Sequence, residues 1–300
     1  MLEPGGDPAR VGLDFSIVIP SYRRPGALGT CLNAIARLDY PRDRFEVVVV
    51  DDGSVPPLPR PEGPVAVTLV RQDNAGPAAA RNLGASRARG TFLAFTDDDC
   101  VPRPDWLSRL GAALGREPEA LVGGRTVNAL TGNAFASASQ ALITYLYAYF
   151  DADPNRSRFF TSNNMALAAE RFRELGGFET GFRHAAGEDR WLCEQWRWRG
   201  WPMRYVPEAI VLHSHDLTLR TFWRQHHRYG GAAHHFHRRR IGEGWVLPPP
   251  EPWAFYGGLL RYPWTVRHPR PFRQMLLLML SQVANVAGYF RERIGAGRLD

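Results

Sequence analysis

The chain has 300 residues, 44% of them hydrophobic, and a formal net charge of +7 at pH 7. A chain of this length and apolar content can bury a substantial core, which excludes a disordered protein. We expect one large domain, with or without a helical appendage. The basic excess, which is all arginine, indicates a phosphate-bearing partner or a membrane surface and does not choose between them.

The cysteines give no sign of a disulfide framework. Cys31, Cys100 and Cys193 are odd in number, lie far apart and form no CxxC pair, which also argues against a zinc ribbon. The first fourteen residues lack the basic and then apolar layout of a signal peptide. We therefore expect a protein of the reducing cytoplasm.

Four apolar runs in the first hundred residues have the composition of strands in a parallel sheet, because they do not alternate with polar residues. The intervals after Pro25 and from Pro77 to Gly90 predict helices, and the Pro-rich interval between the second and third runs predicts a loop. This order predicts an α/β doubly wound fold, whose ligands bind beyond the carboxyl ends of the strands. The four runs are "FSIVIP" (15–20), "FEVVVV" (45–50), "VAVTLV" (65–70) and "TFLAFT" (91–96).

Beyond residue 101 the chain mixes expected helices ("PDWLSRLGAAL", "ERFRELG", "DRWLCEQWRWRG") with short strands near "ALVGGRTV" and "MRYVPEAIVLHSH". After residue 216 it becomes basic, aromatic and His-rich, and then Pro-rich. Its longest apolar run, 275–290, is shorter than the about 20 residues that cross a bilayer, so we expect a buried or interfacial helix there. We predict one domain over 12–216 and a helical C-terminal region over 217–300.

Acidic residues follow the predicted strands. Asp51 and Asp52 follow the second, Asp73 the third and the run Asp97 to Asp99 the fourth. Carboxylates about 4 Å apart repel by about 4 kcal/mol at an effective dielectric constant near 20, so such a cluster favours a bound cation. Mg²⁺ or Mn²⁺, carrying a nucleotide diphosphate, suits these oxygen ligands. The alternative is a solvated acidic turn, or a cap for the helix that follows.

Six motifs in this order resemble the family 2 glycosyltransferases of the GT-A fold, over about residues 15 to 215. They are "FSIVIPSYRRPGALGTCLNAI", "VVVVDDGS", "NAGPAAARNLGASRARGTFLAFTDDDC", "NNMALAAERFRELGGFE", "GEDRWL" and "VLHSH". The resemblance implies a GT-A fold, a mostly parallel sheet flanked by helices, with a C-terminal helical extension. It also implies a nucleotide-sugar donor, a divalent cation and inverting transfer to an acceptor hydroxyl.

The resemblance places the donor nucleotide at the first two strand ends and on the following helix. Pro20, Ser21 and Tyr22 would meet the base, with the Tyr22 ring offering a stacking face, and Asp52 would accept a hydrogen bond from uracil or thymine. Arg81 would face the nucleotide. Three of these residues have simpler alternatives: Tyr22 as a loop aromatic, Asp52 as part of an Asp-Gly turn and Arg81 as a surface arginine.

The resemblance assigns the acids after the fourth strand to the donor and the cation. Asp97 would lie near the ribose and Asp99 on the metal, while Asp98 could share either task. His213, in "VLHSH", would approach the metal or the diphosphate, although a histidine on a strand is more often a packed residue.

The resemblance also names the chemistry of the "GED" motif. Asp189 would be the general base that takes the acceptor proton, and Glu188 would orient the acceptor or the loop. The alternative is that both acids stabilise the helix dipole.

Two further motifs match the family's loop between the donor and acceptor sites. Asn163 and Asn164 would bond sugar hydroxyls, and Gly176 and Gly177 would let the backbone approach the ligand. The alternative is a turn that ends a helix.

The processive members' QxxRW motif is not matched by "QWRW" at 195–198, so we expect addition of a single sugar. The basic segment 224–240 is interpreted as a face toward an acceptor phosphate or anionic lipid, or as a solvated helix, in preference to a His metal site. Acceptors left open are a glycan, a lipid-linked saccharide or a small molecule. We expect a cytoplasmic protein with peripheral contact at the inner face of the membrane.

Two other classes compete with this interpretation. A nucleotidyltransferase that makes nucleotide sugars would carry a Gly-rich basic loop after the first strand, where "IPSYRRPGAL" has only Gly26 and Gly29. A nucleic-acid-binding protein would not place three aspartates where phosphates bind. We therefore expect no nucleic-acid partner.

Overall fold

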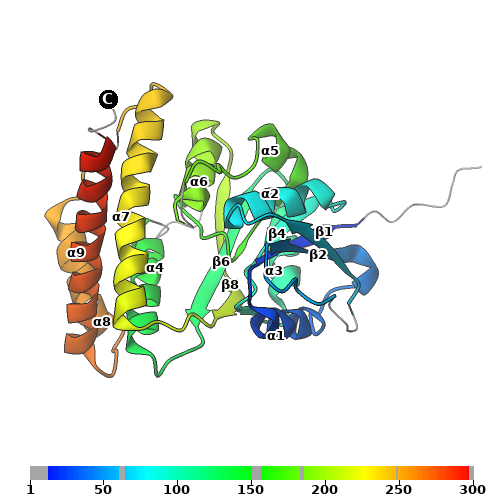
Figure 1. Ribbon diagram of the computed structural model, residues 1–300, viewed down its shortest axis with the longest axis horizontal. Coiled ribbons are helices and arrows are strands. Elements are labelled where there is room, and N and C mark those ends of the chain that lie inside the picture. Colours follow the sequence, from blue (N-terminus) through cyan, green and yellow to red (C-terminus); the bar gives the residue numbers. More distant parts are fainter. Residues whose placement is uncertain (1–12, 61–64, 151–156, 183–185, 248, 297–300) are drawn as a thin grey trace, which may run out of the picture.

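A computed structural model describes residues 13–60, 65–150, 157–182, 186–247 and 249–296. The described residues form one eight-stranded sheet with helices on both faces (Figure 1). The strand order is β3-β2-β1-β4-β7-β6-β8-β5. The strands are β1 Phe15–Ser21, β2 Phe45–Asp52, β3 Val67–Gln72, β4 Phe92–Phe95, β5 Cys100–Pro102, β6 Leu121–Asn128, β7 Met165–Ala168 and β8 Met203–His213.

The sheet is mixed and mostly parallel. β1 pairs parallel with β2 and β4, β2 with β3, and β6 with β8, whereas β7 is antiparallel to both of its neighbours and β5 to β8. The α/β prediction is confirmed, and the four expected strands are β1 to β4, the third beginning two residues later than predicted. β5 and β7 are additional short strands.

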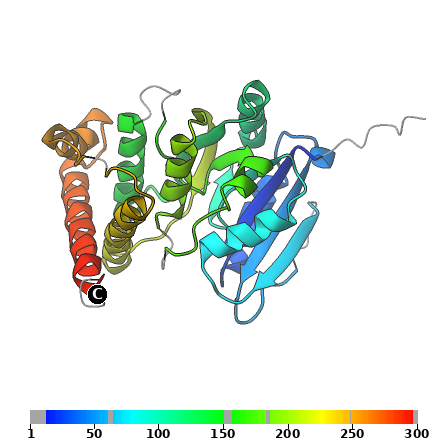
Figure 2. The ribbon, with the colours of Figure 1, turned by 90° about the horizontal axis from the view of Figure 1, so that it is seen from above.

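Helices cover the sheet in two layers (Figures 1 and 2). α1 (Pro25–Ile35) and α3 (Trp106–Arg116) pack on one face, and α2 (Pro77–Arg87), α5 (Ala169–Glu174) and α6 (Glu188–Trp198) pack on the other. The predicted loop between β2 and β3 contains no helix among its described residues. A short 3₁₀ turn, Arg42–Arg44, leads into β2.

Alternating side chains of the central strands fill both layers, as expected for strands that are buried on two sides. Ile17 and Val49 belong to the core under α1 and α3, whereas Val18 and Phe95 belong to the core under α2, α5 and α6. α2 lies close to β1 because Gly84 has no side chain, and a Cβ there would lie 2.5 Å from Val18 Cγ1. This packing holds the start of α2 beside the carboxyl ends of the strands.

The remaining helices form a separate stack at the end of the sheet (Figure 1). α4 (Ala134–Phe150), which the sequence patterns did not predict, shares a small core with α8 (Trp253–Thr265) and α9 (Pro271–Ala296). α7 (Leu219–Gly242) begins at Thr218, whose side chain accepts from the backbone N–H of residue 221 in a capping box. The predicted apolar helix is confirmed within the longer α9. The domain boundary at residues 216 and 217 stays a prediction.

α7 and α9 run side by side in both ribbon views (Figures 1 and 2). Glycines allow their backbones to touch: a Cβ on Gly230 would lie 1.8 Å from the Asn285 carbonyl oxygen, and a Cβ on Gly288 would lie 1.8 Å from that of His227. None of the helices in the described part of the chain is both long enough and apolar enough to cross a membrane. The three cysteines are buried and form no disulfide.

Candidate active site

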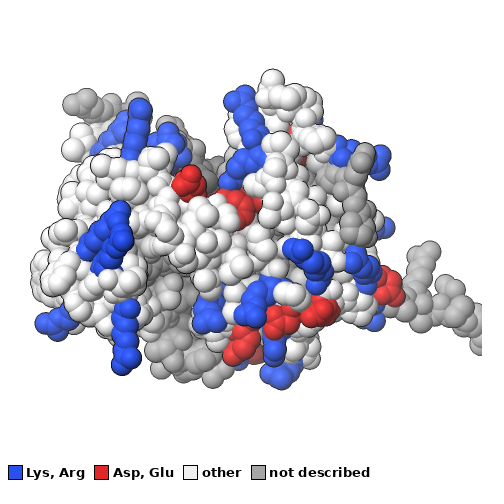
Figure 3. Space-filling model, turned by 90° about the horizontal axis from the view of Figure 1, so that it is seen from below, with Lys and Arg blue, Asp and Glu red and all other residues white. Residues whose placement is uncertain are grey.

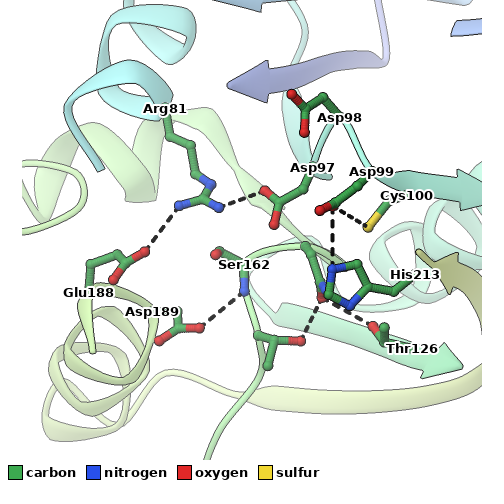
Figure 4. A network of polar contacts seen from close by, with 12 residues as sticks. Arg81, Asp97, Asp98, Asp99, Cys100, Thr126, Ser162, Glu188, Asp189 and His213 are labelled. Atoms are coloured by element: carbon green, nitrogen blue, oxygen red, sulfur yellow. Dashed lines mark hydrogen bonds and ion pairs between the residues drawn. The ribbon is translucent and has the colours of Figure 1, made fainter. Parts of the chain in front are cut away.

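The acids after β4 lie at the carboxyl edge of the sheet, where the predicted site was placed, and they point in different directions (Figure 4). Asp98 is fully buried: its Oδ2 accepts a 2.7 Å hydrogen bond from Ser21 Oγ, and its Oδ1 lies 2.6 Å from the Arg24 guanidinium. Burial raises the pKa of Asp98 to about 7, although Arg24 and Ser21 oppose the shift. Asp98 therefore points away from the carboxylates of Asp97 and Asp99 and holds the loop onto β1.

Asp99 and His213 meet because β5 pairs with β8, which places Cys100 opposite His213. Asp99 Oδ1 lies 3.3 Å from His213 Nε2, and Asp99 Oδ2 lies 2.5 Å from Arg24 Nη1. Burial alone would raise the pKa of Asp99, but the hydrogen bond and charge of His213, together with Arg24, lower it. Burial alone would lower the pKa of His213, but Asp99 raises it.

These residues fit a divalent cation site. Asp99, Cys100 and His213 each offer one ligand atom, and the three atoms lie within 4.8 Å of one another. Burial raises the pKa of the Cys100 thiol well above its ordinary value, so the sulfur stays neutral. The carboxylate oxygen and the imidazole nitrogen are then the ligands that a cation such as Mn²⁺ would use. In the structure, Arg24 supplies the positive charge beside Asp99.

Arg81 joins the two acidic motifs (Figure 4). From α2, its Nη2 lies 2.6 Å from Asp97 Oδ1 and its Nη1 lies 3.1 Å from Glu188 Oε1, and only 4% of its side chain is exposed. Gly187, which has a φ of 97° at the start of α6, makes the turn that points Glu188 toward Arg81. The alternative that Arg81 is a surface residue is therefore wrong, because its side chain is buried and connects two acidic residues.

Asp189 lies one residue beyond Glu188 and faces the loop before β7. Its Oδ2 accepts a 3.4 Å hydrogen bond from the Ser162 backbone N–H, and its Oδ1 accepts one of 2.7 Å from the Arg190 backbone N–H. Burial and the neighbouring charge of Glu188 raise its pKa to about 7, although the two backbone donors and Arg81 oppose the shift. A half-buried carboxyl with a pKa near neutrality is suited to exchange a proton under ordinary conditions.

The expected base-binding residues lie at the ends of β1 and β2. Pro20 and Ser21 are buried, and the Tyr22 ring is 38% exposed. The Asp52 carboxylate already accepts hydrogen bonds from the side chains of Gln72 and Asn74 and from the backbone N–H groups of residues 75 and 76. These four donors match the acceptor capacity of a carboxylate. Base binding by Asp52 stays a prediction, and it would require one of these donors to be displaced.

The paired asparagines differ in their environments. Asn164 is fully buried, with its Oδ1 accepting from Trp106 Nε1 at 2.8 Å and its Nδ2 donating to the Ala209 carbonyl at 3.0 Å. A sugar contact by Asn164 would require this network to open. Asn163 Oδ1 accepts from the hydroxyls of Thr126 and Thr161, and Asn163 lines a cavity.

The paired glycines form the turn that ends α5, which was the alternative to a role in ligand binding. Gly176 and Gly177 both have a φ of 82°, and a Cβ on Gly177 would lie 2.6 Å from Asn82 Oδ1. Asn82 also exchanges two hydrogen bonds of 2.8 Å with the backbone of Phe178. The Phe178 ring, which follows this turn, has its centroid 5.7 Å from the Arg81 guanidinium. The turn therefore helps to position Arg81. Direct contact of these glycines with a ligand stays a prediction.

A cavity of about 80 Å³ opens between the sheet edge and the helical stack. Most of its lining consists of neutral hydrogen-bonding side chains from β6, β8, α4, α7 and the loop before β7. The polar lining residues are Thr126, Asn128, Ser139, Gln140, Thr161, Asn163, His213, His215, Gln225 and Tyr229.

Several residues of the candidate site were not predicted from the sequence. Arg24 lies two residues after Tyr22 in "SYRRPG", but no local pattern places it between Asp98 and Asp99. Gln225 and Tyr229 come from the basic segment 224–240, which was interpreted as a face toward an acceptor phosphate or anionic lipid, or as a solvated helix, and not as the lining of a cavity. The spacing of four residues between Gln225 and Tyr229, which places both on one face of a helix, was the available signal.

Solved structures show which fold this sheet has. A mannosyltransferase of Pyrobaculum calidifontis, in complex with GDP-Man and Mn²⁺, superposes with a TM-score of 0.60 over 93% of this chain and 90% of its own, at 19% identity. GalNAc-T7, with UDP, GalNAc and Mn²⁺, superposes with a TM-score of 0.54 over 75% of this chain and 48% of its own, at 18% identity. The sheet therefore has the GT-A fold of glycosyltransferases, with a C-terminal helical extension.

The family follows from the sequence itself. Residues 16–176 match the family model described as "Glycosyl transferase family 2". The chain belongs to this family. It is 30% identical over 228 residues to the pre-mycofactocin glycosyltransferase of Mycobacterium tuberculosis, a match that covers 73% of this chain and 47% of that protein. The chain thus spans about half the length of this curated relative.

Proposed function

We propose that the chain transfers a single sugar from a nucleotide-diphosphate sugar to an acceptor hydroxyl, with inversion at the sugar carbon. The observation that carries this proposal is the Arg81 bridge, which joins Asp97 of the strand-end acids to Glu188 of the "GED" motif. It holds the proposed donor residues and the proposed base, Asp189, at one edge of the sheet. Membership of glycosyl transferase family 2 supports the class of reaction.

The donor would lie along the ends of β1 and β2. The Tyr22 ring, which is 38% exposed and has the Arg23 guanidinium 5.0 Å from its centroid, would stack on the base, and Asp97 would face the ribose. We propose a uridine or thymidine diphosphate sugar. The similar solved structures contain GDP-Man and UDP, so the first property to determine is which nucleotide base the donor carries.

Asp99 and His213 would hold a divalent cation, Mg²⁺ or Mn²⁺. When bound, this ion supplies the positive charge that stabilises the leaving diphosphate. The mutual contact of Asp99 and His213 at 3.3 Å keeps the pair together in a largely buried position. Arg24, which now neutralises Asp99, would be free to contact a diphosphate oxygen instead.

Asp189 would act as the general base. Its carboxylate takes the proton from the acceptor hydroxyl while that oxygen bonds to the sugar carbon and the bond from this carbon to the diphosphate breaks. Burial and Glu188 raise the pKa of Asp189 to about 7, which makes the carboxylate a stronger base than an exposed aspartate. Arg81 fixes Glu188 and so keeps this neighbouring charge in place.

The acceptor would enter the cavity between the sheet edge and α7. Hydroxyl, amide and imidazole groups line it, and such neutral donors and acceptors suit a hydroxyl-rich ligand. Asn163 lines it from the loop before β7, and Gln225 lines it from α7. A glycan, a lipid-linked saccharide and a small molecule are all compatible with these contacts.

A donor panel tests the proposal. Nucleotide sugars with uracil, thymine and guanine bases would be titrated by calorimetry with Mn²⁺, and release of the nucleotide without acceptor would be followed for each. We expect one donor to bind in a cation-dependent manner and to be hydrolysed slowly. Release of pyrophosphate from a nucleoside triphosphate and a sugar phosphate, with no donor bound, would overturn the proposal in favour of a nucleotidyltransferase.

A further inference from the structure

α9 carries many of its large apolar side chains on the side that faces solvent, while Leu277, Leu278 and Leu280 pack inward against the neighbouring helices. Seven of the outward-facing side chains recur every three or four residues along the helix and are between 45% and 70% exposed. We call this set the outer face of α9. It consists of Phe272, Leu276, Met279, Val283, Val286, Phe290 and Ile294.

Apart from Leu278, the buried residues of α9 are small or polar. Gln274 is 2% exposed and Ser281 is fully buried, as is Ala284. Gly288 touches the backbone of α7. A helix on the surface of a domain in water ordinarily has the reverse pattern, with the apolar stripe toward the core. Small and polar residues between helices, with apolar residues outside, are typical of helices that pack in contact with lipid.

The charges around this face are almost all positive. From residue 251 to residue 296 the chain has six arginines and two glutamates, a net charge of +4. The arginines are all exposed, and among the described residues none of them forms an ion pair. In Figure 3 the end of the molecule that carries the C-terminal helices, at left, is mostly white with separate blue side chains, and red side chains lie nearer the middle. The arginines are Arg261, Arg267, Arg270, Arg273, Arg291 and Arg293.

We infer that the outer face of α9 binds the surface of an anionic lipid bilayer. The apolar side chains would enter the boundary between headgroups and acyl chains, while the arginines contact lipid phosphates. The Trp264 ring, 5.1 Å from that of Phe272, extends the apolar surface onto α8 and is of the type that gathers at membrane interfaces. Because α9 does not have the composition of a spanning helix, it would lie along the surface.

A second copy of the chain is the other candidate for this face, because the exposed residues follow the spacing of a coiled-coil seam. The charges argue against it. Two copies joined by this face would bring the same unpaired arginines together, and Arg273, directly beside Phe272 and exposed, would lie at the seam. An anionic surface neutralises these charges, whereas a second copy doubles them.

Vesicle sedimentation tests the inference. The wild-type protein would be mixed with vesicles of phosphatidylcholine, alone and with phosphatidylglycerol, at low and high salt. We expect binding to the anionic vesicles that weakens with salt, and a loss of about tenfold in partitioning for Leu276→Ser combined with Val283→Ser. The matched control is Val55→Ser combined with Leu219→Ser, which removes exposed apolar side chains elsewhere and should bind as the wild type does.

Circular dichroism and thermal unfolding would establish that both variants fold. Equal binding of the wild type to neutral and anionic vesicles would overturn the role of the arginines, and no binding to either would overturn the inference as a whole. A wild-type dimer in light scattering that becomes a monomer in the Leu276→Ser and Val283→Ser variant, without vesicle binding, would assign the face to a second copy. None of these results depends on the proposed transfer reaction.

Discussion

The guanidinium of Arg81 lies 3.1 Å from Glu188 Oε1, although the two residues are 107 positions apart in the chain. Both side chains are almost fully buried, at 4% and 6% exposed. The ion pair therefore connects the start of α2 to the start of α6 inside the protein. Charges in such a position are stable only while each has its partner.

Replacing Arg81 by alanine should leave Asp97 and Glu188 without a partner. We expect a loss of about 3 to 5 kcal/mol in the free energy of unfolding, because breaking a buried pair leaves an uncompensated charge. Urea denaturation measures it. Arg109→Ala, which breaks an exposed pair with Asp105, is the control and should change the free energy of unfolding by less than about 1 kcal/mol. Equal effects of the two substitutions would mean that the Arg81 bridge is not structural.

Asp189→Asn should abolish transfer and leave donor binding intact. The amide keeps the shape of the side chain but does not accept a proton, so turnover should fall by about 10² to 10⁴-fold. Calorimetry with the nucleotide sugar and steady-state kinetics with an acceptor separate the two effects. Glu208→Gln removes an exposed carboxylate on β8 and serves as the control. Unchanged turnover in Asp189→Asn would remove this residue as the base.

The pH dependence of transfer should report on Asp189. Its pKa is raised to about 7, and only the ionised carboxylate accepts a proton, so kcat/KM should rise with pH and level off above about 7. Glu188→Gln removes a neighbouring negative charge, which lowers the pKa of Asp189 and moves this rise to lower pH. A profile that is flat from pH 5 to pH 8, or a shift to higher pH in Glu188→Gln, would contradict the assignment.

Chelation should abolish donor binding, and added Mn²⁺ should restore it. Asp99→Ala and His213→Ala should each prevent this recovery, because they remove the proposed oxygen and nitrogen ligands. Cys100→Ser is the matched control: it keeps the size of the buried side chain and removes only a thiol that stays neutral. Donor affinity would be measured by calorimetry before and after dialysis. Full affinity in the presence of the chelator would show that the site needs no cation.

The contact between α7 and α9 should be sensitive to a single methyl group. Gly288→Ala would place a Cβ 1.8 Å from the His227 carbonyl oxygen, so the helices would have to separate, and we expect a loss of about 1 to 3 kcal/mol in the free energy of unfolding. Gly257→Ala in α8 meets no atom within 4 Å and should be neutral or stabilising. Thermal and urea unfolding of the two variants provide the comparison.

Much of the proposed donor half of the site could be predicted from the sequence. β1, β2 and β4 are continuous apolar runs, and parallel strands bring their carboxyl ends to one edge, so the positions of Asp52 and Asp97 followed from local patterns. The short strands β5 and β7 could not be predicted in this way, because "CVP" and "MALA" have few β-branched residues and depend on their neighbours in the sheet.

The rest of the site depended on contacts that no local pattern contains. The pairing of Arg81 with Glu188 and the approach of Tyr229 to the cavity both join segments that are far apart in the chain. The two asparagines also could not be told apart from the sequence. Asn163 and Asn164 are adjacent, and only the structure shows that Asn164 accepts a hydrogen bond from Trp106.

Because α7 lies between α9 and the cavity, it sets the distance from the outer face of α9 to the cavity. Gln225 and Tyr229 line the cavity, whereas Gly230, on a different side of the same helix, touches α9. If the outer face of α9 rests on a bilayer, the cavity is held about 20 Å above it, the width of two packed helices. The pair of helices would then act as a molecular ruler: an acceptor anchored in the membrane would react only if its hydroxyl projects that far, and shorter headgroups would be excluded by reach alone.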